Sequence, residues 1–230
     1  MCKAHGNNRV LVFSSVGSRP AEVLERNVLS WCHPGIDICC VSYHKRDVPD
    51  SIRSACRYLD CHEGLKFPNL WWFTDTHNLV GYDYVFVVDD DILIRGVDVL
   101  RMVDRMRSVG AVVSSPAHDP AGKISWSVMS AKPDRATRRT NFVEMTCPIF
   151  ETSALLTFLC EQRVLNIIDF GSDLLMSKVL FRPENPFLIF HDVVIHNPRR
   201  PNRRECGRQE YERHRKLLAL DVRNLGTVGV

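Results

Sequence analysis

The sequence has no large excess of charge, no regular cysteine framework and no long apolar run. Its formal net charge of +3 is too small to indicate a nucleic-acid partner by itself. The nine cysteines are an odd number and include no Cys-x-x-Cys pair, whereas a disulfide scaffold normally has an even number in a much shorter chain. We therefore expect reduced thiols and no nucleic-acid partner.

Signals for membrane insertion and secretion are also missing. No apolar stretch reaches the roughly 20 residues that a membrane-spanning helix needs. Residues 1–6 lack the long apolar core of a signal peptide. These absences predict a cytoplasmic protein without a transmembrane segment, or one domain of a larger protein.

The sequence does contain the pattern of an α/β domain. Its 230 residues, 45% of them hydrophobic, suit a single domain with a substantial core. Short apolar runs at 9–15, 36–43 and 82–88 predict buried parallel strands, and helical patterns separate them. This alternation up to about residue 115 predicts a Rossmann-type, mainly parallel central sheet flanked by helices. A nucleotide-binding half followed by an acceptor-binding half is one interpretation.

The remaining segments alternate less regularly. Further strands are predicted at 111–115, 124–128, 141–150 and 187–195, and further helices at 51–59, 66–79, 97–108, 153–160 and within 169–180. After residue 198 the composition changes to arginine, asparagine and glutamate, which marks 199–230 as a basic, helical C-terminal tail.

Three consecutive aspartates, Asp89, Asp90 and Asp91, follow the 82–88 strand. In an open α/β sheet, ligands bind beyond the carboxyl ends of the strands. Three carboxylates there repel one another unless a cation is present, and Mn²⁺ and Mg²⁺ prefer such oxygens. In an extended segment Asp89 and Asp91 point to the same side, where they would hold a metal that neutralises a diphosphate. Asp90 would bond a ribose hydroxyl. A solvated acidic turn or a helix cap is the structural alternative.

Several motifs, in this order along residues 9–197, resemble the glycosyltransferase A fold and, more narrowly, the DUF707 family of glycosyltransferase-like proteins. They are Asn69-Leu70-Trp71-Trp72-Phe73, Tyr82-Asp83-Tyr84-Val85-Phe86, the aspartates 89–91, Ser125-Trp126, Phe142-Val143-Glu144-Met145, Cys147-Pro148-Ile149-Phe150, Gly171-Ser172-Asp173 and Val194-Ile195-His196. Sugar-transferring domains encoded by chlorella viruses are similar in size and in lacking a signal sequence. The chain departs from the DUF707 pattern at Asp90, where the family has Glu, and before Gly171, where it often has Trp.

The resemblance implies a metal-dependent hexosyl- or pentosyltransferase with residues 1–198 as its catalytic domain. Residues 9–115 would form the nucleotide-sugar-binding half and 116–198 the acceptor half. The donor would be a nucleotide-sugar, with UDP-sugars favoured, and the acceptor a glycan or glycoprotein. The resemblance also supports Asp89 and Asp91 as the metal pair and places His196 as a third metal ligand. A strand-end histidine that bonds its own loop is the alternative for His196.

Five residues outside the aspartates are candidates for the donor site. Ser15 and Gly17 lie in the loop after the first strand, where small residues allow close approach to a nucleotide. Tyr43 ends the second strand and would stack on a base, unless it is a packing residue. Lys66 would contact the base or diphosphate, although a lone lysine is usually solvated. Trp126 would provide an aromatic platform for the sugar.

Asp173 and Glu144 are the candidates for acid–base chemistry. The resemblance implies that Asp173 deprotonates the acceptor hydroxyl in an inverting enzyme, a role that requires hydrogen-bond reach; a plain helix cap is the alternative. Glu144 lies among apolar neighbours, where an unpaired carboxylate is costly. It would act as the base or bind acceptor hydroxyls, unless it pairs with Arg135, Arg138 or Arg139.

Two further questions stay open at the level of sequence. The arginine-rich segment 199–216 is either a lid over the diphosphate, a contact for nucleic acid or an anionic membrane, or a solvated helix, of which the last is favoured. The same aspartates also permit a metal-dependent phosphotransferase or phosphohydrolase. The triplet lies in mid-chain and is followed by Ile92-Leu93, which does not match the early Asp-x-Asp-x-Thr of haloacid-dehalogenase-type enzymes.

Overall fold

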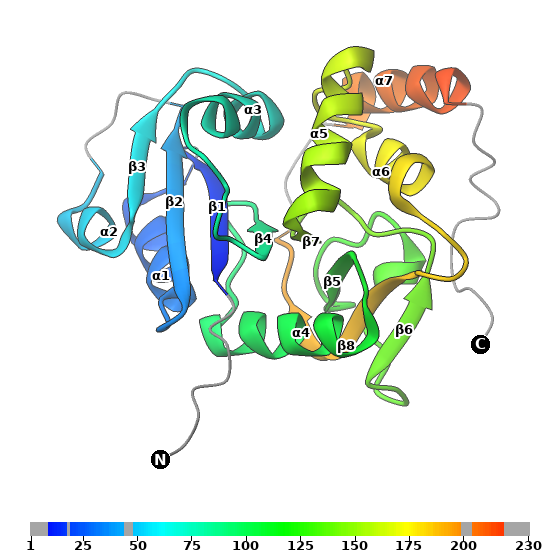
Figure 1. Ribbon diagram of the computed structural model, residues 1–230, viewed down its shortest axis with the longest axis horizontal. Coiled ribbons are helices and arrows are strands. Elements are labelled where there is room, and N and C mark those ends of the chain that lie inside the picture. The colour runs from blue at the N-terminus through cyan, green and yellow to red at the C-terminus, as the bar shows by residue number, and fades with distance from the viewer. Residues whose placement is uncertain (1–8, 18, 44–47, 199–203, 219–230) are drawn as a thin grey trace.

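The computed structural model describes residues 9–17, 19–43, 48–198 and 204–218. For residues 204–208 it describes the backbone alone. An eight-stranded sheet with strand order β3-β2-β1-β4-β7-β5-β8-β6 crosses the molecule (Figure 1). The first half comprises β1 (Val10–Val16), α1 (Ala21–Trp31), β2 (Ile36–Ser42), α2 (Asp50–Ala55), β3 (Tyr58–Cys61), α3 (Lys66–Thr76), β4 (Tyr84–Val87) and α4 (Gly96–Val109). The second half comprises β5 (Val113–His118), the 3₁₀ turn η1 (Ser127–Met129), β6 (Thr137–Thr140), β7 (Ile149–Glu151), α5 (Thr152–Leu165), α6 (Ser172–Leu180), β8 (Phe187–Ile195) and α7 (Arg204–Leu217).

The four strands of the first half are parallel. β1 lies between β2 and β4, and β3 forms the edge beside β2. Because every crossover returns the chain to the same end, the carboxyl ends of these strands share one edge of the sheet. The predicted α/β class, with a mainly parallel sheet flanked by helices, is confirmed.

A short antiparallel strand joins the two halves. β7 pairs antiparallel with β4 on one side and with β5 on the other. β8 then pairs parallel with β5, and β6 forms the second edge. This arrangement carries the hydrogen-bonded sheet without a break from the first half to the second.

Both faces of the sheet are covered, so the central strands alternate between two cores. In β1, Leu11 and Phe13 join the core under α3, α5 and α6, whereas Val10 and Val12 join the core under α1, α2 and α4. Burial of each such side chain stabilises the fold by about 1.5–3 kcal/mol. The burial on both sides explains why these strands appear in sequence as continuous apolar runs.

Three predicted elements differ in the structure. The 51–59 helix ends at Ala55, and Tyr58–Cys61 instead pairs with β2 as an edge strand. The 124–128 strand is absent from this part of the described chain, where a 3₁₀ turn forms. Of the 141–150 strand, only Ile149–Glu151 is a strand, because Pro148 has no N–H to donate to a ladder. β6 was not predicted from its polar sequence Thr-Arg-Arg-Thr.

No helix among the described residues is long and apolar enough to cross a membrane.

Candidate functional site

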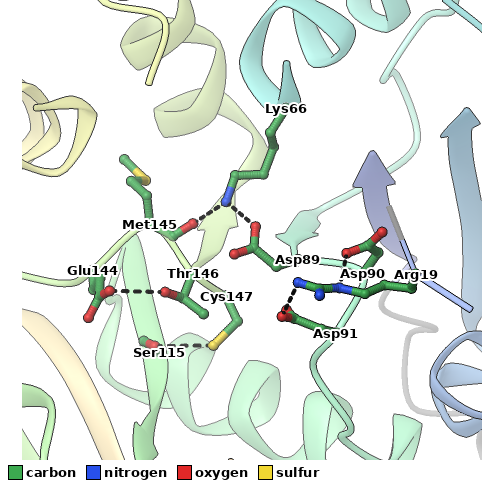
Figure 2. A network of polar contacts seen from close by, with 10 residues as sticks. All are labelled: Arg19, Lys66, Asp89, Asp90, Asp91, Ser115, Glu144, Met145, Thr146 and Cys147. Carbon is green, nitrogen blue, oxygen red and sulfur yellow. Dashed lines mark hydrogen bonds and ion pairs between the residues drawn. The ribbon is translucent and has the colours of Figure 1, made fainter. Parts of the chain in front are cut away.

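The three aspartates form a turn directly after β4. The Ile92 amide donates to the Asp89 carbonyl at 3.2 Å, and the Asn27 side chain donates to the Asp90 carbonyl at 3.0 Å. The expected extended arrangement is therefore wrong here, because a turn does not alternate its side chains as a strand does. Asp89 points away from Asp90 and Asp91, which both face Arg19 (Figure 2). We call residues 89–91 the acidic turn.

Two cations partly neutralise the acidic turn. Lys66 Nζ lies 2.6 Å from Asp89 Oδ1 and also donates to the Met145 carbonyl. Arg19 Nη2 lies 2.6 Å from Asp91 Oδ2, and its Nε lies 3.4 Å from Asp90 Oδ1. With three carboxylates and two cations, the group is formally negative by one charge. Burial raises the pKa of Asp90, and the Arg19 guanidinium opposes that rise.

The loop after β1 is tied to the acidic turn and to α3. Gly17, with φ 146°, donates its backbone N–H to Asp90 Oδ2 at 3.3 Å. Ser15 Oγ accepts a 2.6 Å hydrogen bond from Asn69 of α3. Tyr43 is partly exposed, and its amide donates to the Val16 carbonyl, so it lies beside this loop. The structure thus gathers four of the five predicted donor-site residues, Ser15, Gly17, Tyr43 and Lys66, at one edge of the sheet.

The metal assignment is supported by ligand chemistry and not by convergence of the side chains. Carboxylates of Asp89 and Asp91 are the ligand type that Mn²⁺ and Mg²⁺ prefer. Within the described ranges, however, no group of three or more His, Cys, Asp and Glu side chains is gathered for a metal. His196 is 58% exposed and lies 3.1 Å from Asp119. Through this contact the histidine bonds the loop that follows β5, 77 positions away in the chain.

Glu144 lies at the same edge, in the predicted acceptor half. The segment that carries it runs beside the acidic turn, because the Asp89 amide donates to the Thr146 carbonyl at 3.0 Å. Glu144 Oε1 accepts hydrogen bonds from Ser125 at 3.0 Å and from Thr146 at 3.2 Å (Figure 2 shows the second). Met145 and Thr146 therefore connect the donor-side and acceptor-side groups.

His118, at the end of β5, lies beside Glu144. Its Nδ1 lies 3.8 Å from Glu144 Oε2, and the side chain is fully buried at the end of β5. Neither ring nitrogen, nor Glu144 Oε2, has a hydrogen-bond partner among the described residues. Burial lowers the pKa of His118, and the Glu144 charge opposes this. Two of the three predicted arginine partners contact other groups: Arg135 pairs with Asp134, and Arg138 donates to the Val128 carbonyl.

Asp173 lies in the first turn of α6 and is not its N-cap residue. The residue at the cap position is Gly171, with φ 96°, and no side-chain cap is formed. Asp173 Oδ1 instead accepts from the Leu174 amide at 2.9 Å. Although part of the residue is open to solvent, burial of the carboxylate, followed by repulsion from Glu144, raises the pKa of Asp173 to about 7. A carboxylate with this pKa is suited to exchange protons near neutral pH.

Trp126 connects Asp173 to the rest of the acceptor side. Its side chain forms a hydrogen bond with Asp173. Its ring centroid lies 4.7 Å from that of Phe142 and 5.7 Å from that of Tyr211. Trp71 and Trp72 lie against the core, as expected from their place on α3.

Sequence reasoning missed Arg19, Asn27, Asn69 and His118. Their contacts join residues that are 26 to 72 positions apart in the chain, so no local pattern marks them. A hollow of about 530 Å³ beside residues 74–82, Thr152, Ser153 and Leu156 lies at the opposite edge of the sheet, before β4 begins. It contains none of the predicted site residues.

Solved structures with a similar fold allow a comparison with known proteins. The crystal structure of S. aureus TarS 1–349 in complex with UDP-GlcNAc matches this chain with a TM-score of 0.63 and 13% identity, covering 92% of this chain and 65% of that one. The complex of TarS 1–349 with UDP gives 0.62 and 12%, covering 92% and 64%. TarS itself gives 0.62 and 11%, covering 94% and 40%. This chain has a glycosyltransferase fold.

That finding confirms the predicted glycosyltransferase A-like fold class. It shows the fold alone. The chain spans less than two thirds of the length of these neighbours. No family model matches the sequence. No curated protein matches it by sequence either. The narrower resemblance to the DUF707 family and to chlorella-virus domains is therefore not shown.

Proposed function

We propose that the chain transfers a sugar from a nucleotide-sugar donor, with UDP-sugars favoured, to a hydroxyl group of a glycan or glycoprotein. The proposal rests on the arrangement at one edge of the sheet. There the acidic turn, with its two cations, lies beside Glu144 and Asp173. TarS, which has the same fold, was solved with UDP-GlcNAc and with UDP.

On the donor side, Lys66 and Arg19 supply positive charge for the diphosphate of the donor. Asp90 holds the Gly17 loop in place, and Ser15 and Tyr43 lie beside it. Asp89 and Asp91 would hold Mn²⁺ or Mg²⁺, which would supply further charge to stabilise the departing nucleoside diphosphate.

On the acceptor side, Asp173 takes the proton from the attacking hydroxyl. The hydroxyl oxygen forms its bond to the anomeric carbon as the bond to the diphosphate oxygen breaks, and the nucleoside diphosphate leaves with that electron pair. Glu144 helps to keep the pKa of Asp173 near 7 by charge repulsion. Trp126 orients the carboxylate through its hydrogen bond.

Calorimetric titration tests the donor assignment. UDP, GDP and UDP-GlcNAc are titrated into the protein with and without Mn²⁺. We expect saturable UDP binding that Mn²⁺ strengthens and that Asp89→Asn and Asp91→Asn each weaken by at least about tenfold, because each variant removes a carboxylate from the proposed metal site. Asp98→Asn, a surface aspartate on α4 paired with Arg95, serves as the matched control. Absence of nucleotide binding with metal present would refute the proposal.

Lys66 gives an independent test of the same site. Lys66→Ala removes the cation between Asp89 and the Met145 carbonyl, and we expect UDP affinity to fall by about tenfold with a weaker dependence on salt. Lys123→Ala, at an exposed lysine, should leave affinity unchanged. Release of inorganic phosphate from nucleotides without sugar transfer would instead support a phosphohydrolase or phosphotransferase.

A further inference from the structure

The C-terminal helix α7 docks on the segment that leads into Asp173. His214 is 1% exposed, and its Nδ1–H donates to the Phe170 carbonyl. A Cβ atom at Gly171 would lie 2.7 Å from His214 Cβ, so the helix and this turn are in close contact. Figure 1 shows α7 beside α5 and α6. The favoured prediction of a solvated tail is therefore wrong for this face of the helix.

A second contact anchors the end of α7. Lys178 Nζ of α6 donates to the Leu218 carbonyl at 2.8 Å, and Leu218 is 3% exposed within the core under α5 and α6. The two contacts lie on either side of Asp173 in sequence. They restrict movement of the first turn of α6, which carries that carboxylate.

Tyr211 lies on α7 between these contacts and faces the acceptor side. Its ring lies 5.7 Å from that of Trp126, which is itself bonded to Asp173. Its hydroxyl is buried and has no partner among the described residues. Burial, followed by the Asp173 charge, raises the pKa of Tyr211; Glu212 adds to this and Arg215 opposes it. Asp173 is thus the charge that acts most strongly on this hydroxyl.

We propose that α7 is a functional part of the acceptor half and that Tyr211 is a positioning residue for Asp173. Through its hydroxyl, Tyr211 donates to the Asp173 carboxylate when that group is ionised, and its ring holds Trp126 against the same carboxylate. The role of Asp173 as a catalytic base rests on the proposed function. The pairing of Tyr211 with Asp173 does not.

The pairing is tested by titrating Asp173 through the fluorescence of Trp126 in the full-length protein. Ionisation of a bonded carboxylate changes indole emission, so the wild type should show a transition near pH 7. Asp173→Asn removes the titrating group and Trp126→Phe removes the fluorophore. Both variants should abolish the transition, which assigns it to this pair of residues. Glu144 and Trp126 act on Asp173, and the Asp173 charge acts on Tyr211, so variants of these three residues should move the transition.

Tyr211→Phe keeps the ring and removes only the hydroxyl. We expect the midpoint to rise by about one pH unit, because a donor to the charged carboxylate is lost. Tyr58→Phe, on β3 and bonded to Arg57, is the matched control and should not move it. A Tyr211→Phe midpoint equal to that of the wild type, or a wild type without a transition, overturns the assignment. A moved midpoint in a protein that binds no UDP supports the pairing and refutes only the proposed transferase.

Discussion

Replacement of Asp173 by Asn should stabilise the protein at alkaline pH and not at acid pH. The pKa of Asp173 is about 7 in the folded protein, whereas an unfolded aspartate has a pKa of about 3.9. Between these values the unfolded chain releases its proton and the folded protein retains it. The free energy of unfolding therefore falls as pH rises through this window and levels off above it. Asn has no titratable proton, so the free energy of unfolding of the variant does not fall in this way.

The magnitude follows from the shift of about three pH units, which corresponds to roughly 4 kcal/mol at about 1.36 kcal/mol per unit. Asp173 is partly exposed, and Asn weakens the hydrogen bond with Trp126, so we expect about 1–2 kcal/mol at pH 8. The difference should be smallest at pH 4, where folded Asp173 is protonated and the unfolded residue, with a pKa of about 3.9, is about half protonated.

Urea unfolding at pH 4, 6 and 8 measures this difference. Asp119→Asn is the matched control, because the Ala121 amide, followed by His196, lowers the pKa of Asp119. Ionised Asp119 therefore stabilises the fold at pH values above the unfolded pKa, and this stability is lost as pH falls. Replacement of Asp119 should not raise the free energy of unfolding at pH 8. An Asp173→Asn protein that is no more stable than the wild type at pH 8 would refute the reasoning about its environment.

Two further predictions concern the neighbours of Asp173. Glu144→Gln removes the charge that raises the pKa of Asp173, so the acid limb of the pH–rate profile for sugar transfer should move about one unit lower; an unchanged limb would show that Glu144 does not act on the base. Gly171→Ala should destabilise the protein by about 2 kcal/mol or more in thermal unfolding, because its φ is 96° and the new Cβ would lie 2.7 Å from His214 Cβ. Gly110→Ala, with φ 67° and nothing within 4 Å, isolates the backbone part at about 1 kcal/mol, and equal losses in the two variants would contradict the contact with α7.

The sequence determined those parts of the protein in which local pattern and burial coincide. β1 and β4 are short apolar runs buried on both faces, and the acidic turn follows β4 directly. β8 was predicted at its observed bounds, 187–195. Because the carboxyl ends of neighbouring parallel strands meet at one edge, the place of the aspartates also followed from sequence.

The tertiary structure decided which side chains meet at that edge. The partners of the acidic turn, Arg19 and Lys66, come from a loop and a helix remote from it in sequence. β6 has a polar sequence that becomes a strand only because β8 offers it an edge. The docking of α7 depends on a buried face that its charged composition conceals. Such contacts depend on how the elements pack, and local hydrophobic periodicity contains no information about that packing.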